Sequence, residues 1–151
     1  HRAQAAPNRA AAPLLFQFAV LVEADLAVRQ GAYARALATT NGLLAALRQF
    51  GMRAVVPQAL YLRGQALLGL HQTQTARVTL LEAHAEAEVI GSRRMLWPIL
   101  AALADLETDP TQSDLLRQEA QAQIRAIAGN TPAELQARFL GLPATRQLLT
   151  A

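Results

Sequence analysis

Few residues of this chain have the types and spacing that a metal site requires. His84 and Glu88 are four positions apart, which would place both side chains on one face of a helix, and they form the sole candidate pair of metal ligands. No further ligand stands at helical spacing from this pair. We therefore expect a solvated pair on an acidic helix face that also carries Glu82 and Glu86, and we predict no bound metal.

Other residues of chemical interest fit no catalytic template. Asp105, Glu107 and Asp109 follow one another at intervals of two, so they would not face each other on a helix, and a role at a helix end suits them better. Gly64 and Gly69 have the spacing of a phosphate-binding loop, but leucine and histidine follow them in place of lysine and a hydroxyl residue. No serine has a recognisable relay partner, and cysteine is absent. The sequence predicts a protein that is not an enzyme and has no cofactor.

The composition indicates one helical domain. The chain has 151 residues, of which 52% are hydrophobic and 17% charged, and this length is sufficient for a core without disulfides. Alanine and leucine are abundant, and no segment alternates apolar and polar residues as a half-buried strand would. The fold class predicted is all-α.

Charge is distributed unevenly along the chain, whose formal net charge is +3. Every basic residue is an arginine; residues 1–78 hold eight of them against two acids, and residues 79–151 hold six against nine. There is no long basic run, and Arg93-Arg94 is the only doublet. We therefore expect no nucleic-acid partner.

Nothing in the sequence predicts a membrane partner. The most apolar stretch, residues 14–22, is too short to span a bilayer. The first residues lack the pattern of a signal peptide, so we expect a cytoplasmic chain that is a piece of a longer protein.

Punctuating residues divide the chain into helical segments. Residues 1–13 have no apolar periodicity and are interpreted as a linker, and residues 14–151 as the domain. The helices are predicted over 14–29, 33–50, 54–69, 73–90, 93–107, 113–128, 132–140 and 143–149. Pro98 is expected to kink its helix near Arg94 or to delay its start to about Trp97.

The last segments are expected to form a cap over about 131–149. Thr131 and Glu134 have the spacing of a capping box, and Gly141 is expected to end the helix in a left-handed conformation. The residues predicted to cover the end of the core are Leu135, Phe139, Leu140 and Leu142.

Self-comparison reveals a period of about 40 residues. Gly51 and Arg53 recur as Gly91 and Arg93. Small residues recur at two places, midway along the first helix of each pair and near the start of the second, where two backbones must approach closely. They are Ala24, Gly64 and Ala104 in the first helices and Ala36 and Ala76 in the second.

Residues 31–37, GAYARAL, and residues 59–68 followed by 74–77 resemble the tetratricopeptide (TPR) repeat family. The period exceeds that family's usual length, and His71-Gln72-Thr73 stands where glycine and an aromatic residue are usual. The longer period is similar to the helical-repeat regions of large bacterial signal-transduction ATPases and of maltose-activator-type transcription regulators. Residues 91–107 and 138–148 resemble the C-terminal end of such arrays.

The resemblance implies about three antiparallel helix pairs stacked as a short right-handed superhelical solenoid with a C-terminal capping helix. It also implies that the first helix of each pair lines a concave face, which would carry Asp25, Tyr61, Gln65 and Asp105 as a candidate binding row. The alternative is that these residues form an ordinary solvated face. Trp97 and the pair Phe16 and Phe18 are interpreted as packing residues.

The function implied is a non-catalytic module that binds a protein, a peptide or a small effector. It would act as a scaffold and sensor in a larger bacterial regulator, in contact with other domains of the parent chain. A free-standing peptide-binding adaptor is the alternative, and a nucleic-acid-binding helical repeat is the class that the charge pattern favours least.

Overall fold

The computed structural model describes residues 11–151, and in this part of the chain it is entirely helical, with no strand. The predicted all-α class is confirmed. The helices are α1 (Ala11–Arg29), α2 (Tyr33–Gln49), the short 3₁₀ helix η1 (Arg53–Val55), α3 (Val56–Gly69), α4 (Thr73–Ile90), α5 (Arg93–Leu106), α6 (Pro110–Gly129), α7 (Ala133–Gly141) and α8 (Pro143–Thr150).

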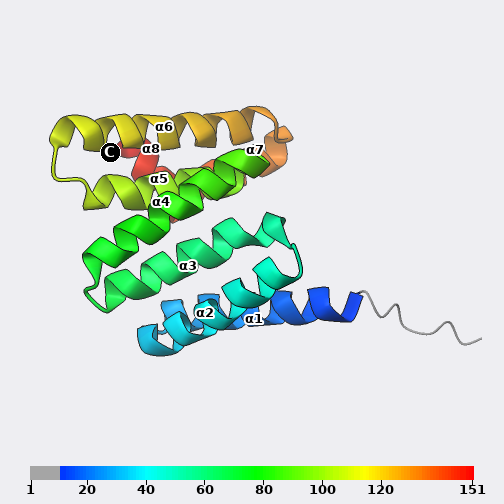
Figure 1. The fold of residues 1–151 in the computed structure, drawn as a ribbon. Coiled ribbons are helices and arrows are strands. Elements are labelled where there is room, and N and C mark those ends of the chain that lie inside the picture. The colour runs from blue at the N-terminus through cyan, green and yellow to red at the C-terminus, as the bar shows by residue number, and fades with distance from the viewer. Residues whose placement is uncertain (1–10) are drawn as a thin grey trace, which may run out of the picture.

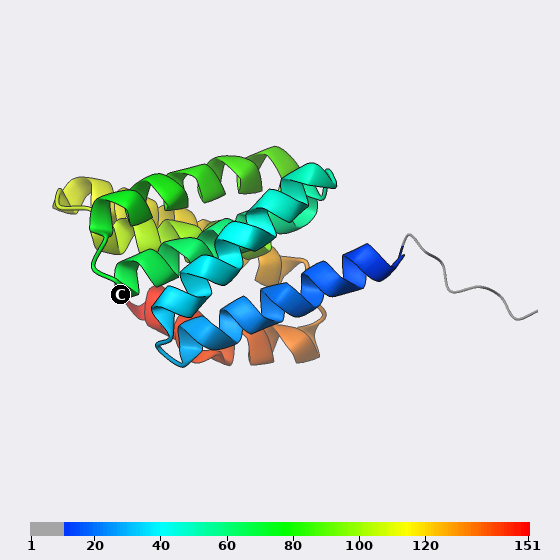
Figure 2. The same ribbon diagram turned by 60° about the horizontal axis from the view of Figure 1, so that its bottom comes forward.

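Each long helix packs mainly on its neighbours in the sequence. Successive helices from α1 to α6 run in opposite directions and follow one another across the molecule, while α1 and α3, and α3 and α5, also touch (Figure 1). After α6 the chain turns back, so that α7 and α8 both contact α6 (Figure 2). Residues far apart in sequence, on α3, α5 and α8, thereby come together.

The four turns that join successive helices from α1 to α5 share one hydrogen-bonded form that recurs every 20 residues. In each of these four turns the backbone N–H after a left-handed residue donates to the carbonyl five residues earlier, at 2.9 Å, which is the pattern of a Schellman motif. The left-handed residues are Gly31, Gly51, His71 and Gly91. His71 thus adopts the conformation that glycine adopts elsewhere, with φ of 60°.

Small residues lie where the helices come closest. The recurring alanines Ala24, Ala36, Ala76 and Ala104 are all buried. At Gly64 a Cβ would lie 2.8 Å from Cδ2 of Leu80, a fully buried side chain of α4. The Leu80 side chain therefore packs directly on the backbone of α3, in space that a side chain at position 64 would need.

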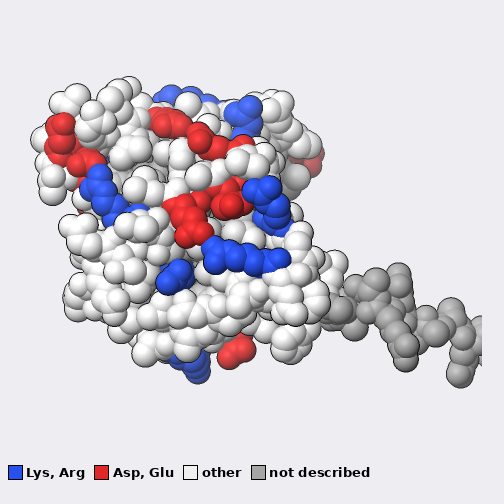
Figure 3. Space-filling model, viewed as in Figure 1, with Lys and Arg blue, Asp and Glu red and all other residues white. Residues whose placement is uncertain are grey.

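Ion pairs connect the basic first half of the chain to the acidic second half. Three arginines from residues 1–78 bind three glutamates that lie 30 to 34 positions later. Figure 3 shows basic and acidic side chains next to one another on the face that it draws. The pairs are Arg48–Glu82, Arg53–Glu86 and Arg77–Glu107. The uneven charge along the sequence is therefore partly balanced in the fold.

Two acidic residues that follow α5, Glu107 and Asp109, form hydrogen bonds at the ends of helices. Asp109 accepts a hydrogen bond from the backbone N–H of Thr111 at 2.9 Å and so caps the N-terminus of α6. Glu107 accepts from Arg77 at 2.7 Å and from the N–H groups of Thr108 and Asp109, and these hydrogen bonds, chiefly that from Arg77, hold the pKa of its carboxyl below its usual value.

Several local expectations were wrong at the ends of helices. α1 begins at Ala11 rather than at residue 14, because Pro13 fits in a first helical turn; the rest of the predicted linker, residues 1–10, lies outside the described residues. α5 begins at Arg93 with Pro98 inside it, so of the two outcomes expected at Pro98 the delayed start is excluded.

The predicted capping box at α7 is also absent. The hydroxyl of Thr131 instead donates to the carbonyl of Ile127 in α6, and α7 begins without a side-chain cap. Gly141 is the last residue of α7 and has no positive φ, because Pro143 favours an extended conformation at the intervening residue Leu142.

Adding a methyl group at Gly64 tests the close helix contact. We expect Gly64→Ala to lower the free energy of unfolding by about 1–3 kcal/mol, because Leu80 is fully buried and would have to shift within a close-packed core. Gly42→Ala is the matched control: nothing lies within 4 Å of that Cβ in α2, so alanine should raise stability by up to about 1 kcal/mol. Urea unfolding measures both, and equal stabilisation by the two variants would contradict the contact.

His71 offers a test of the recurring turn. His71→Gly should raise the free energy of unfolding by about 0.5–1 kcal/mol, because glycine adopts positive φ without the steric cost that a Cβ brings. Gly91→Ala, at a turn of the same form, should lower it by about 1 kcal/mol. Thermal and urea unfolding provide the measurement; a glycine at position 71 that leaves stability unchanged or reduced would exclude the strained turn.

Candidate functional site

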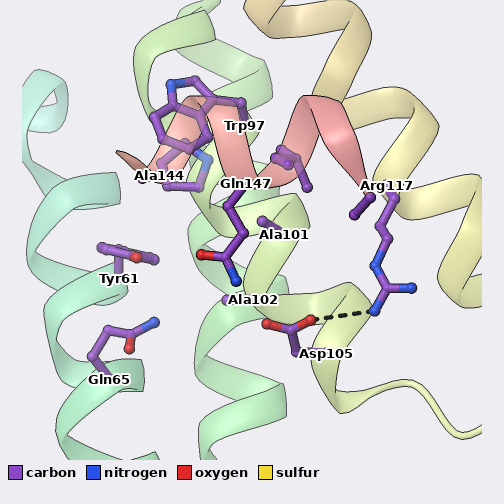
Figure 4. Close-up of a pocket in the computed structure, with 12 residues that line it drawn as sticks. Tyr61, Gln65, Trp97, Ala101, Ala102, Asp105, Arg117, Ala144 and Gln147 are labelled. Carbon is purple, nitrogen blue, oxygen red and sulfur yellow. Dashed lines mark hydrogen bonds and ion pairs between the residues drawn. The ribbon is translucent and has the colours of Figure 1, made fainter. Parts of the chain in front are cut away.

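A pocket of about 550 Å³ opens where α3, α5, α6 and α8 meet (Figure 4). Its apolar lining comes from α5 and α8, and polar side chains from all four helices reach it. The apolar residues are Trp97, Pro98, Ala101, Ala102, Ala144 and Leu148, and the polar ones are Tyr61, Gln65, Asp105, Arg117 and Gln147, with Ala151 at the C-terminal side.

Three of the four residues of the predicted binding row line this pocket. Tyr61 and Gln65 lie four positions apart on α3 and face Asp105 on the neighbouring helix α5 (Figure 4). Asp25 on α1 is not part of the lining, and its carboxylate forms an ion pair with Arg29 at 2.8 Å. Asp25 affects the pocket through its charge, which acts on Tyr61.

The phenol of Tyr61 is partly buried in the lining of the pocket. Burial disfavours the phenolate, and the negative charge of Asp25 adds to this effect, so the pKa of Tyr61 is raised above its ordinary value of 10.0. The hydroxyl keeps its proton at neutral pH and can donate a hydrogen bond to a ligand.

Asp105 and Arg117 give the pocket groups of both charges. A guanidinium nitrogen of Arg117 lies 3.4 Å from the carboxylate of Asp105 and 3.9 Å from that of Asp114. The Asp105 side chain is mostly exposed, so this ion pair is weak and can exchange for contacts to a ligand.

The helix α8 is the part of the site that the sequence did not predict. It was expected to cap the end of the core, yet its residues form one wall of the pocket. Two hydrogen bonds hold α8 in place. The side-chain amide of Gln121 donates to the backbone carbonyl of Leu148 at 2.9 Å, and the hydroxyl of Thr145 donates to the backbone carbonyl of Phe139 at 2.7 Å. Thr145 itself is buried.

The predicted cap residues divide into two groups. Phe139 and Leu140 are partly buried against the core, as expected, whereas Leu135 and Leu142 are exposed. Trp97 packs against the core as predicted and also lines the pocket, whereas Phe16 and Phe18, which were also interpreted as packing residues, are exposed. Arg117 and Gln147 were missed, since no spacing in the sequence relates α6 or α8 to α3.

Substitution of Asp25 separates the two causes of the raised pKa of Tyr61, which are burial and the charge of Asp25. In a Tyr33→Phe background Tyr61 is the only tyrosine, and its phenolate absorbance reports its titration. Asp25→Asn should lower the pKa of Tyr61 but leave it above 10.0, because burial is the larger cause. Glu23→Gln, on the same helix, should leave it unchanged.

The same shift predicts how stability changes with pH. Because the folded state keeps the Tyr61 proton after the unfolded chain has lost it, stability should fall as the pH rises above 10.0. Tyr61→Phe should remove that part of the loss in alkaline urea unfolding; an unchanged alkaline loss would contradict the raised pKa.

No protein-family model, curated protein or solved structure matches this chain. The pocket and the helix packing are therefore the observations that bear on its function.

Proposed function

We propose that this chain is a non-catalytic binding module whose pocket between α3, α5, α6 and α8 receives a peptide segment or a small effector. The observation that carries the proposal is the convergence of Tyr61, Gln65 and Asp105 on one open pocket beside the Trp97 ring. An apolar pocket with a few convergent polar groups is typical of ligand sites, and its volume of about 550 Å³ falls in their usual range.

The lining favours a ligand with an amide or basic group next to an apolar or planar one. The exposed carboxylate of Asp105 can bind a cation or an N–H group, and the Gln65 amide can pair with a peptide bond. The Trp97 and Tyr61 rings provide the surface against which an apolar side chain packs. Arg117, released from Asp105, could bind a carboxylate.

The helix pairs are proposed to form a short right-handed solenoid of the TPR type, with α7 and α8 as its terminal cap. Two observations support this arrangement: the left-handed turn residues recur every 20 positions, and the small residues at helix contacts recur every 40. In such an array the pocket lies on the concave side, where α1, α3 and α5 are exposed to a partner.

The outer face of α1 supports a place in a larger regulator. Phe16 and Val22 are 64% and 66% exposed, whereas Val56 and Leu62, which stand 40 positions later on α3, are 5% and 4% exposed. On α3 these positions are buried, and α2 packs on that helix, whereas the equivalent positions on α1 have no preceding helix in the described residues to cover them. We propose that a helix of a neighbouring domain or partner protein covers this face, as α2 covers α3.

Residues 11–151 include no helix with the length and apolarity to cross a membrane. A role inside the cytoplasm, within a signal-transduction protein or transcription regulator, belongs to the same proposal.

The test begins with peptides selected from a displayed random library against the whole chain. Isothermal titration calorimetry should then show that Gln65→Ala and Asp105→Ala each weaken binding at least about tenfold, since each removes a direct polar contact. Asp25→Ala should have a smaller effect, because Asp25 lies outside the lining.

Glu134→Ala provides the control, because Glu134 is an exposed carboxylate on α7 away from the pocket lining. Its affinity should equal that of the wild type. If Gln65→Ala and Asp105→Ala bind as tightly as Glu134→Ala while all three variants stay helical by circular dichroism, the pocket is not the binding site.

A further inference from the structure

Three potential metal ligands from two helices meet on the face of the molecule formed by α4 and α6. His84 and Glu88 lie four positions apart on α4, and Glu119 of α6 joins them. One ligand atom of each residue lies within 4.8 Å of the other two. The sequence offered only the first pair, and the fold adds the third residue from 31 positions beyond Glu88.

The position of His84 is unusual for a polar residue. The residues 40 positions before and after it are Leu44 and Ile124, and both are buried aliphatic side chains of the core. The His84 side chain is only 22% exposed, and its Nε2 is buried without a hydrogen-bond partner. An imidazole nitrogen without a partner is costly to bury unless something binds it.

Charge balance also sets these carboxylates apart. The other glutamates of α4, Glu82 and Glu86, each bind an arginine. Among the described residues no arginine forms an ion pair with Glu88 or Glu119, and the one near partner of Glu88 is Nε2 of His84 at 3.7 Å. Two adjacent carboxylates without a cation repel each other, and a bound cation would relieve this repulsion.

We propose that His84, Glu88 and Glu119 form a binding site for a divalent first-row transition metal ion, with Zn²⁺ as the best match. One imidazole nitrogen and two carboxylate oxygens are ligands that zinc accepts, and water would fill the fourth position. Ligand atoms on a tetrahedral zinc at about 2.1 Å stand roughly 3.4 Å apart, so the side chains must close up slightly. The two exposed carboxylates are free to do so.

The bound ion would join α4 to α6, two helices that are separated in sequence by α5. Metal binding to the folded state alone stabilises that state, so Zn²⁺ should raise the melting temperature of the protein. This site is distinct from the pocket, with which it shares no residue.

The test uses the whole chain, stripped with a chelator, and ZnCl₂ as the probe. Calorimetry should show one Zn²⁺ per chain, and Co²⁺ should give the visible absorption of a bound ion. Glu119→Gln and His84→Leu should each weaken Zn²⁺ binding at least about tenfold, because the loss of an outer-shell partner alone costs about 10- to 100-fold. Leucine at position 84 reproduces the buried Leu44 of the preceding helix pair, so this variant is expected to fold.

Glu86→Gln is the control, since Glu86 lies on the same helix and its carboxylate binds Arg53 at 3.2 Å. It should bind Zn²⁺ like the wild type and show the same rise in melting temperature. The proposal is wrong if the wild type binds no Zn²⁺, or if either His84→Leu or Glu119→Gln binds it with wild-type affinity.

Discussion

The close packing of helices at small residues is the constraint on which the rest of this structure depends. At Gly64 the contact leaves no room for even a methyl group, because Leu80 of α4 fills the space. Ala24, Ala36, Ala76 and Ala104 are buried at the recurring contacts of the other helices. These residues set the distance between neighbouring helices, and leucines on either side then fill the core.

The pocket follows from this spacing. The helices α3 and α5 contact each other. Tyr61 and Gln65 of α3 therefore lie opposite Asp105 of α5 in the pocket. The chain then folds back, and α8 closes the pocket on a third side through the buried Thr145 and the contact of Gln121 with Leu148. Packing of small residues thus places polar groups from distant parts of the chain at one opening.

The sequence predicted the helices well, because their apolar periodicity and the glycines between them are local signals. It also predicted the buried alanines, since a 40-residue period is visible without a structure. It failed where a residue depends on contacts between distant elements. Thr131 bonds back to α6 instead of capping α7, α8 forms a pocket wall, and Glu119 meets His84. No spacing along the chain encodes these meetings.

Trp97 is the only tryptophan of the chain and lies in the pocket, so its indole N–H signal in a ¹H–¹⁵N correlation spectrum reports directly on this site. The spectrum would be recorded while a selected peptide ligand is added until calorimetry shows saturation. The indole signal should shift in step with binding. An indole signal that stays in place while the ligand saturates the protein would show that the ligand binds elsewhere and that this pocket is not the binding site.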